Sequence, residues 1–393
     1  MQPRKILPRP LTSADRLRPL RLLVAQHRPG LVISGIPLDA LSAHRLADCV
    51  RSKRPGAMKS LSLLLAGIAS VMALVSSAAV FAAAPRVELD PEVRAFVQDM
   101  SERHGFDRGA LEKLFRETRF MASIIRAMDA PATGLPWHEF RARHITDGRV
   151  KAGLQFWAEN QALLEKASAE FRVPPELIVS TIGVETIFGR RTGTIGVLDA
   201  LTTLAFGYPR RAEFFRGELE QFLLLTRENG IPVSTLKGSF AGAIGIPQFM
   251  PSSYRKYAVD FDGDGIRDLR RLADSIGSVA NYYRQFGWRE GEPVIIPADV
   301  GDAAPEALLP GGIAPHLTIA EFRKRGVVPQ EPVREDAAAA LFAVQTQDGP
   351  RYWFGLNNFY VITRYNRSIN YAMAVNELAT ALRRQRSSAA GNP

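Results

Sequence analysis

A long run without a charged residue, from Leu61 to Ala84, divides this chain into two parts of different character. The run directly follows Met58 and Lys59, begins with a leucine-rich stretch and ends in small residues. A positive start, a short apolar centre and small residues at the end are typical of a secretory signal peptide. The segment that must build a folded core therefore begins at Pro85.

The signal peptide predicts a periplasmic location and a translation start at Met58. The segment before Met58 is far longer than the few charged residues that open an ordinary signal peptide. We therefore interpret residues 1–57 as a mis-annotated leader, residues 58–84 as the signal peptide, and the mature protein as soluble in the periplasm. The alternative is an uncleaved N-terminal membrane anchor, because about 20 apolar residues are enough to cross a bilayer.

Cysteine content and charge exclude several other classes. The only cysteine, Cys49, lies before the uncharged run, so the mature chain has no thiol for a disulfide, a zinc site or a lipid anchor. The formal net charge is +10, but the excess of basic residues is concentrated in residues 1–84 and the remainder is nearly neutral. A nucleic-acid partner is therefore not expected.

Beyond Pro85 the apolar residues repeat mainly with a helical period. After Trp288 the pattern changes to short apolar runs between glycines and prolines, which indicates strands. The predicted fold class is mainly α with a small β unit (α+β). The expected helices cover 91–105, 107–117, 150–171, a segment from 174, 212–230, 275–286 and 371–384, and the expected strands include 351–356 and 359–365.

Glu185 is the candidate catalytic residue that the pattern itself singles out. In a helix it shares a face with Ile178, Thr181, Ile182 and Phe188, so its carboxylate has mostly apolar neighbours. Desolvation raises the pKa of a carboxyl group, and a general acid that works near neutral pH needs a raised pKa. The alternative is a semi-buried glutamate that serves only as a hydrogen-bond partner.

An acidic loop is the candidate metal site. Asp260, Asp262 and Asp264 match positions 1, 3 and 5 of an EF-hand loop, and the carbonyl of Ile266 matches position 7. Arg271 occupies position 12, where an EF-hand has a bidentate glutamate, so the ordinary pattern fails there. A plain acidic turn is the alternative.

Several further segments together resemble a known family. The sequence is similar to the lytic murein transglycosylase B family, whose fold resembles lysozyme with added regions, and the resemblance covers about residues 86–384. The segments that carry it, in that family's order and spacing, are GVET at 183–186, YPRRAEFF at 208–215, KGSFAGAIGIPQFMPSSY at 237–254, DFDGDG at 260–265, IGSVANYY at 276–283 and NFYVITRYNRS at 358–368.

The resemblance implies cleavage of the β-1,4 bond between N-acetylmuramic acid and N-acetylglucosamine in peptidoglycan without water as the acceptor. Glu185 would act first as acid and then as base, and the product would be a 1,6-anhydromuramyl end. One carboxylate would suffice, whereas ordinary glycosidases use two; Glu176 and Asp199 stay open as second acids. The alternatives are a hydrolytic muramidase that uses the same glutamate and a non-catalytic murein-binding protein.

The resemblance also implies which residues bind the substrate. Ser239 would support the N-acetyl group and Gln248 would lie close to the glycan, although a glycine-rich packing loop is the alternative. Arg210 and Arg211 would bind carboxylates of the stem peptide, or are a solvated surface pair. The residues implied to line the cleft around Glu185 are Tyr282, Tyr365, Asn366, Tyr371 and Phe140, the last standing where the family usually has tyrosine.

The same resemblance also implies a bound calcium ion, the binding partners and the domain organisation. The family takes the last calcium-binding carboxylate from the position of Asp274, which instead could cap a helix that begins at Ser275. We expect a structural Ca²⁺, no cofactor for catalysis, glycan strands as the partner, contacts with cell-wall synthesis or division proteins, and a monomer. The expected divisions after the signal peptide are an N-terminal helical region (85–172), a lysozyme-like core (173–289) with the EF-hand-like loop (260–274), a small β unit (290–355), a return segment (356–385) and a disordered tail (386–393).

Overall fold

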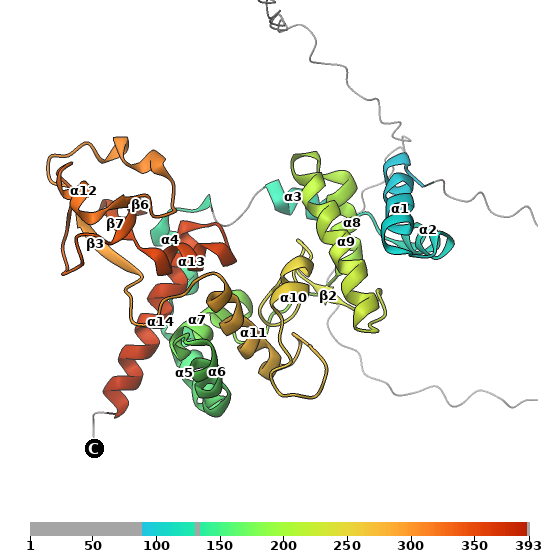
Figure 1. Ribbon diagram of the computed structural model, residues 1–393, viewed down its shortest axis with the longest axis horizontal. Coiled ribbons are helices and arrows are strands. Elements are labelled where there is room, and N and C mark those ends of the chain that lie inside the picture. Colours follow the sequence, from blue (N-terminus) through green and yellow to red (C-terminus); the bar gives the residue numbers. More distant parts are fainter. Residues whose placement is uncertain (1–88, 130–133, 391–393) are drawn as a thin grey trace, which may run out of the picture. The chain divides into compact units, whose positions relative to one another are not determined.

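The computed structural model describes residues 89–129 and 134–390 (Figure 1). The segments interpreted as leader (1–57) and signal peptide (58–84) lie outside the described residues. Their interpretation therefore stays a prediction. Within the described ranges, none of the helices combines the length and the apolar character that a membrane crossing needs.

The first helices begin where aspartate side chains cap them. The carboxylate of Asp90 accepts a hydrogen bond from the second residue of α1 (Pro91–His104), and Asp107 caps α2 (Arg108–Glu117) in the same way. Both helices confirm the prediction. The helix α8 (Val197–Gly207) packs against two other helices, α3 (Ala122–Asp129) and α9 (Ala212–Glu228).

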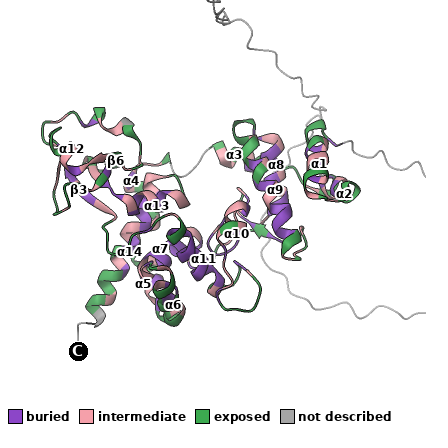
Figure 2. Cartoon of the chain, in the orientation of Figure 1, coloured by how far each residue is buried: buried purple, intermediate pink, exposed green. Residues whose placement is uncertain are grey.

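The helix α7 (Pro175–Thr186) is apolar on nearly every side and lies inside the helical core. A helix of this kind must be covered all round. Figure 2 shows α7 and α11 as largely buried. The helices that contact α7 are α5 (Asp147–Glu159), α6 (Gln161–Phe171), α11 (Leu272–Gln285) and α14 (Ile369–Ala390).

The remaining helices are short. They are α4 (Trp137–His144), α10 (Pro251–Tyr257), α12 (Ile319–Arg323) and α13 (Asn357–Tyr365), with 3₁₀ turns at Pro209–Arg211, Pro305–Ala307 and Leu309–Gly311.

A five-stranded antiparallel sheet confirms the small β unit. Its strand order is β4-β6-β7-β3-β5, with the long hairpin of β6 and β7 at its centre. Phe322 from α12 and Phe354 from β7 anchor a separate small core beneath it. The strands are β3 (Ile295–Asp299), β4 (Leu317–Thr318), β5 (Val328–Pro329), β6 (Ala338–Thr346) and β7 (Gly349–Gly355), and a second, two-stranded sheet joins β1 (Ile195–Gly196) to β2 (Lys237–Gly238).

Two predictions of secondary structure are wrong. The single helix expected over 150–171 is two helices, α5 and α6, which meet at Asn160. The side-chain amide of Asn160 donates a hydrogen bond to the carbonyl of Phe156, and such side chains compete with the helical backbone. The strand expected at 359–365 is the helix α13, because its apolar residues Phe359 and Ile362 also fit one buried helical face.

Helix ends account for the other corrections. The helix α14 begins at Ile369 and runs to Ala390, so residues 386–390 continue a helix instead of forming the expected disordered tail. The helix α11 begins at Leu272. Asp274 therefore lies inside its first turn and does not cap a helix that begins at Ser275.

Close packing of α5 against α7 depends on two glycines. The ring of Phe188 lies where side chains at Gly153 and Gly183 would project. A Cβ atom added to Gly183 would lie 2.7 Å from two carbons of that ring and 3.2 Å from Leu378. Phe188 is 9% exposed, so its ring has little room to move.

We expect Gly183→Ala to destabilise the protein by about 1–3 kcal/mol, because overpacking outweighs the better helix propensity of alanine. The matched control is Gly217→Ala in α9, where an added Cβ has no neighbour within 4 Å. That variant should be as stable as the wild type or up to about 1 kcal/mol more stable. Thermal melting measures both, and equal midpoints for the two variants would contradict the packing argument.

Candidate active site

Glu185 lies in the last turn of α7 and is half-buried. The helix ends directly after it, at Ile187 and Phe188, which both adopt the left-handed conformation (φ 53° and 58°). Such backbone is uncommon outside glycine and needs support from its surroundings. Thr186 supplies support, since its hydroxyl donates to the carbonyl of Ile246 at 2.9 Å and accepts from the backbone of Gly189 at 3.0 Å.

The carboxyl group of Glu185 has one close polar partner among the described residues. The hydroxyl of Tyr371 donates a hydrogen bond to its Oε1 at 2.7 Å. Burial raises the pKa of Glu185 to about 7, and the hydrogen bond from Tyr371 opposes that rise. No described arginine or lysine forms an ion pair with it. The group can therefore hold a proton near neutral pH and release it there.

Tyrosine rings form the wall beside Glu185. Tyr365 stacks on Tyr371 with ring centroids 6.2 Å apart, and it also contacts Tyr282 at 4.8 Å and Tyr283 at 5.7 Å. Burial raises the pKa of Tyr371 well above its ordinary value, so its hydroxyl stays protonated and can donate.

The other hydroxyl groups of this wall are held by the protein. That of Tyr365 donates to the carbonyl of Pro247 and that of Tyr282 to the carbonyl of Arg364, both at 2.6 Å. The hydroxyl of Tyr283 is bonded to Thr181 at 2.7 Å. Sequence reasoning missed Tyr283, for which the only signal was its place beside Tyr282.

The loop between β2 and α10 carries Ser239 and Gln248. The Ser239 oxygen accepts hydrogen bonds from the backbones of Ala241 and Ala243, at 3.3 and 3.1 Å, which leaves its proton available for a ligand. The Gln248 amide nitrogen donates to two carbonyls, those of Thr192 and Gly245. Its Oε1 has no donor within the described part of the chain and can accept from a ligand.

The remaining predicted substrate-binding residues are not gathered around Glu185 by any described hydrogen bond. Arg210 forms an ion pair with Asp129 at 3.6 Å. The Arg211 guanidinium lies over the ring of Phe214, 4.3 Å from its centroid. Asn366 is exposed where α13 ends.

Phe140 lies in the core. It is 4% exposed and its ring stacks on His144 at 4.1 Å.

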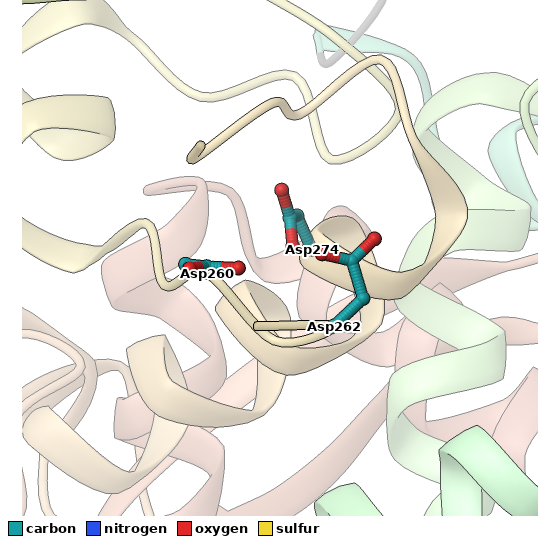
Figure 3. Close-up of side chains that lie close together, drawn as sticks. All are labelled: Asp260, Asp262 and Asp274. Carbon is teal, nitrogen blue, oxygen red and sulfur yellow. The ribbon is translucent and has the colours of Figure 1, made fainter. Parts of the chain in front are cut away.

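Three of the predicted metal ligands come together at the acidic loop. Ligand atoms of Asp260, Asp262 and Asp274 all lie within 4.8 Å of one another (Figure 3). Asp264 does not join them, because it forms an ion pair with Arg271, the residue that replaces the EF-hand glutamate. Ile266 exposes its side chain, while its backbone N–H donates to Asp264.

Backbone hydrogen bonds already shape this loop. The carboxylate of Asp274 accepts from the backbone N–H groups of Phe261 and Asp268, at 2.8 and 2.7 Å. That of Asp260 accepts from Gly263 at 2.8 Å and Gly265 at 2.7 Å. A carboxylate has about four lone-pair sites, so both groups keep capacity for a cation. Clustered carboxylate oxygens are the ligands that Ca²⁺ prefers, and the donor set fits that ion.

Residues 88–380 match the family described as the transglycosylase SLT domain. The membrane-bound lytic murein transglycosylase B of Escherichia coli (strain K12) is 44% identical in an alignment 303 residues long, which covers 75% of this chain and 83% of that protein. This chain therefore belongs to the family of lytic transglycosylases with an SLT domain, which are enzymes.

Solved structures confirm the fold. Soluble lytic transglycosylase SltB1 from Pseudomonas aeruginosa is 47% identical and matches 76% of this chain and all (100%) of that chain, with a TM-score of 0.71. Escherichia coli Slt35 in complex with calcium is 43% identical over 76% of this chain and 94% of that one, with a TM-score of 0.69. Pseudomonas aeruginosa SltB3 in complex with NAG-NAM-pentapeptide is 28% identical (74% and 79% covered, TM-score 0.65).

The hydrogen bond from Tyr371 predicts a shift in pH dependence. From the sequence we expect Glu185 to be the general acid, and activity of a general acid falls as pH rises through its pKa. The basic limb for the wild type should therefore lie near pH 7. Because Tyr371 lowers the pKa of Glu185, Tyr371→Phe should move that limb to higher pH by up to about one unit. The measurement is kcat/KM against pH. Tyr352→Phe, in the β unit, is the control and should leave the limb in place; an unmoved or acid-shifted limb in Tyr371→Phe would contradict the assignment.

Proposed function

We propose that this protein cleaves the β-1,4 bond between N-acetylmuramic acid and N-acetylglucosamine in peptidoglycan, as a lytic transglycosylase with Glu185 as its single catalytic carboxyl group. The observation that carries the proposal is the pKa of Glu185, raised to about 7 at the end of a buried helix and beside one hydroxyl donor. Membership of the lytic transglycosylase family supports it.

The surroundings of the two other candidate acids favour a single-carboxylate mechanism. Glycosidases that use water or a covalent intermediate need a second carboxylate at the scissile bond. Glu176 stands nine residues before Glu185 in α7, about 13 Å away along the helix axis, and pairs with Arg383 at 3.7 Å. Asp199 accepts a hydrogen bond from the backbone of Arg119 at 2.9 Å. Each acid already has a partner other than the carboxyl group of Glu185.

The reaction then needs two proton transfers by one group. Protonated Glu185 gives its proton to the oxygen that bridges the two sugars, and the bond from that oxygen to C1 of the muramyl sugar breaks. The N-acetyl oxygen of the same sugar bonds to C1 and holds the positive charge. The Glu185 carboxylate next takes the proton of the C6 hydroxyl as O6 attacks C1, which displaces the N-acetyl oxygen. The product is a 1,6-anhydro end, and Glu185 is protonated again.

Neighbouring groups would position the sugar for these steps. The free proton of Ser239 suits the N-acetyl group, and Oε1 of Gln248 suits a sugar hydroxyl. Tyr371 holds the Glu185 carboxyl group at a fixed place. Tyr282, Tyr365 and Asn366 complete the proposed wall of the cleft. The pentapeptide fragment bound to SltB3 supports a substrate that carries its stem peptide.

Calcium binding at the acidic loop is a second part of the proposal. Asp260, Asp262 and Asp274 would bind the ion, with a structural and not a catalytic role. The calcium complex of Slt35 supports this assignment. A periplasmic location and a monomeric state are proposed as well, from the predicted signal peptide and the glycan substrate.

The products test the activity. Mass spectrometry of digested peptidoglycan should show anhydro ends, each lighter by one water than a reducing end. Glu185→Gln should lower the rate by at least about 10²-fold, because the proton donor is lost. Glu170→Gln, an exposed glutamate on α6, is the matched control and should keep its activity. Reducing ends alone, or a fully active Glu185→Gln variant, would contradict the proposal.

Calcium should stabilise the fold. At one hundred times the dissociation constant, a ligand that binds only the folded state adds about 2.7 kcal/mol, and the melting midpoint rises accordingly. We expect Asp260→Asn to lose most of this response and Asp348→Asn, in the exposed turn of the β6–β7 hairpin, to keep it. Calorimetry with calcium and with a chelator is the measurement. A midpoint that calcium leaves unchanged would remove the metal from the proposal.

A further inference from the structure

An arginine is bound to the acidic loop at the place where an EF-hand has its last carboxylate. Arg271 directly precedes α11, and its Nη1 forms an ion pair with Oδ2 of Asp264. Its Nε also lies 3.8 Å from Oδ2 of Asp268. Two carboxylates of the loop therefore fix the position of this guanidinium, which carries the opposite charge to the glutamate of the EF-hand pattern.

Asp264 is close to the three clustered aspartates although its carboxylate does not join them. Its backbone N–H donates to Oδ1 of Asp260 at 3.1 Å and to Oδ1 of Asp262 at 3.3 Å, two of the residues drawn in Figure 3. Its own Oδ1 accepts from the backbone of Ile266 at 2.8 Å, while Oδ2 pairs with Arg271. A side-chain rotation that breaks these two contacts is enough to redirect the Asp264 carboxylate.

The charges around the loop leave Arg271 with a special task. The three clustered aspartates form no ion pair with any described arginine or lysine, and their negative charges repel one another. Asp268 has a counterion of its own, because Arg270 donates to both of its oxygens, at 2.8 and 2.9 Å. Arg271 therefore offsets the negative charge of Asp264 and of the cluster beside it.

We propose that Arg271 takes the place of calcium in this loop and competes with the ion for Asp264. Without the ion, the guanidinium neutralises Asp264; when Ca²⁺ binds to the clustered aspartates, the Asp264 carboxylate leaves Arg271 and joins them. The inference rests on calcium binding, which is part of the proposed function. The two side chains of the pair are 51% and 32% exposed, and exposed ion pairs are weak, so Arg271 lowers the calcium affinity without abolishing it.

Calorimetric titration with calcium chloride tests the competition. We expect Arg271→Gln to bind calcium about 5-fold more tightly than the wild type, because the competitor for one carboxylate is lost. Arg270→Gln is the matched control: it removes the same charge from the adjacent residue but releases Asp268 instead of Asp264, and it should change the dissociation constant less than about 2-fold. An unchanged affinity in Arg271→Gln, or equal gains in both variants, would overturn the inference.

Asp264→Asn separates competition for this carboxylate from a general effect of charge. In that background Arg271 has no carboxylate of Asp264 to hold, so adding Arg271→Gln should change the dissociation constant less than about 2-fold. If the gain in affinity were the same with and without Asp264, the ion pair would not be its cause and the inference would be wrong.

Melting midpoints give a second measurement and show that each variant is folded. With a chelator, Arg271→Gln should melt below the wild type, because Asp264 loses its counterion. In saturating calcium that difference should disappear, since the ion then neutralises the loop. The same difference under both conditions would mean that Arg271 and calcium do not exchange, which contradicts the proposal.

Failure of the inference and failure of the calcium site are distinguishable. If neither the wild type nor Arg271→Gln binds calcium, the proposed metal site is wrong and this inference falls with it, while the anhydro products still test the enzyme activity. If the wild type shows no measurable binding and Arg271→Gln binds calcium, the competition is supported in its strongest form.

Discussion

The hydrogen bond between Tyr371 and Glu185 is the interaction on which the site depends. Burial alone would leave a protonated carboxyl group free to rotate, and the tyrosine hydroxyl gives it one orientation. The two effects on the pKa have opposite signs, and burial is the larger, which leaves the pKa at about 7. A group with that pKa can serve as an acid and as a base in one turnover, since neither state is costly near neutral pH.

Packing of the surrounding helices determines where Glu185 and Tyr371 lie. The helix α7 is enclosed by four other helices, and its end is fixed by two residues with left-handed backbone and by the hydroxyl of Thr186. The glycines at 153 and 183 let the ring of Phe188 pass between α5 and α7. The depth of Glu185 below the surface is thus set by the core around the last turn of α7.

Local patterns were enough to predict much of this fold. Helical spacing predicted α1 and α2, and the apolar face around position 185 singled out the glutamate with the raised pKa. The failures occurred where a short pattern fits two structures. The apolar residues of α13 satisfy both alternation and a helical face, and only tertiary packing decides between them. Asn160 broke a helix that its neighbours favoured.

Local sequence patterns could not predict contacts between residues that are distant in the chain. Only the family resemblance brought Tyr371 near Glu185, and nothing in the spacing predicted that Asp264 would turn to Arg271 instead of joining the other aspartates. Tyr283 was overlooked because its partner, Thr181, lies on another helix. These contacts are determined by how the helices pack together, and that packing depends on many residues that are far apart in the sequence.

The separation of Glu185 from its hydroxyl donor along the chain, 186 residues, also bears on how the protein is made. A ribosome synthesises Glu185 well before Tyr371, so a nascent chain that ends between these two residues has the glutamate without the tyrosine that orients it. The proposed catalytic group therefore becomes oriented only after synthesis has passed α14.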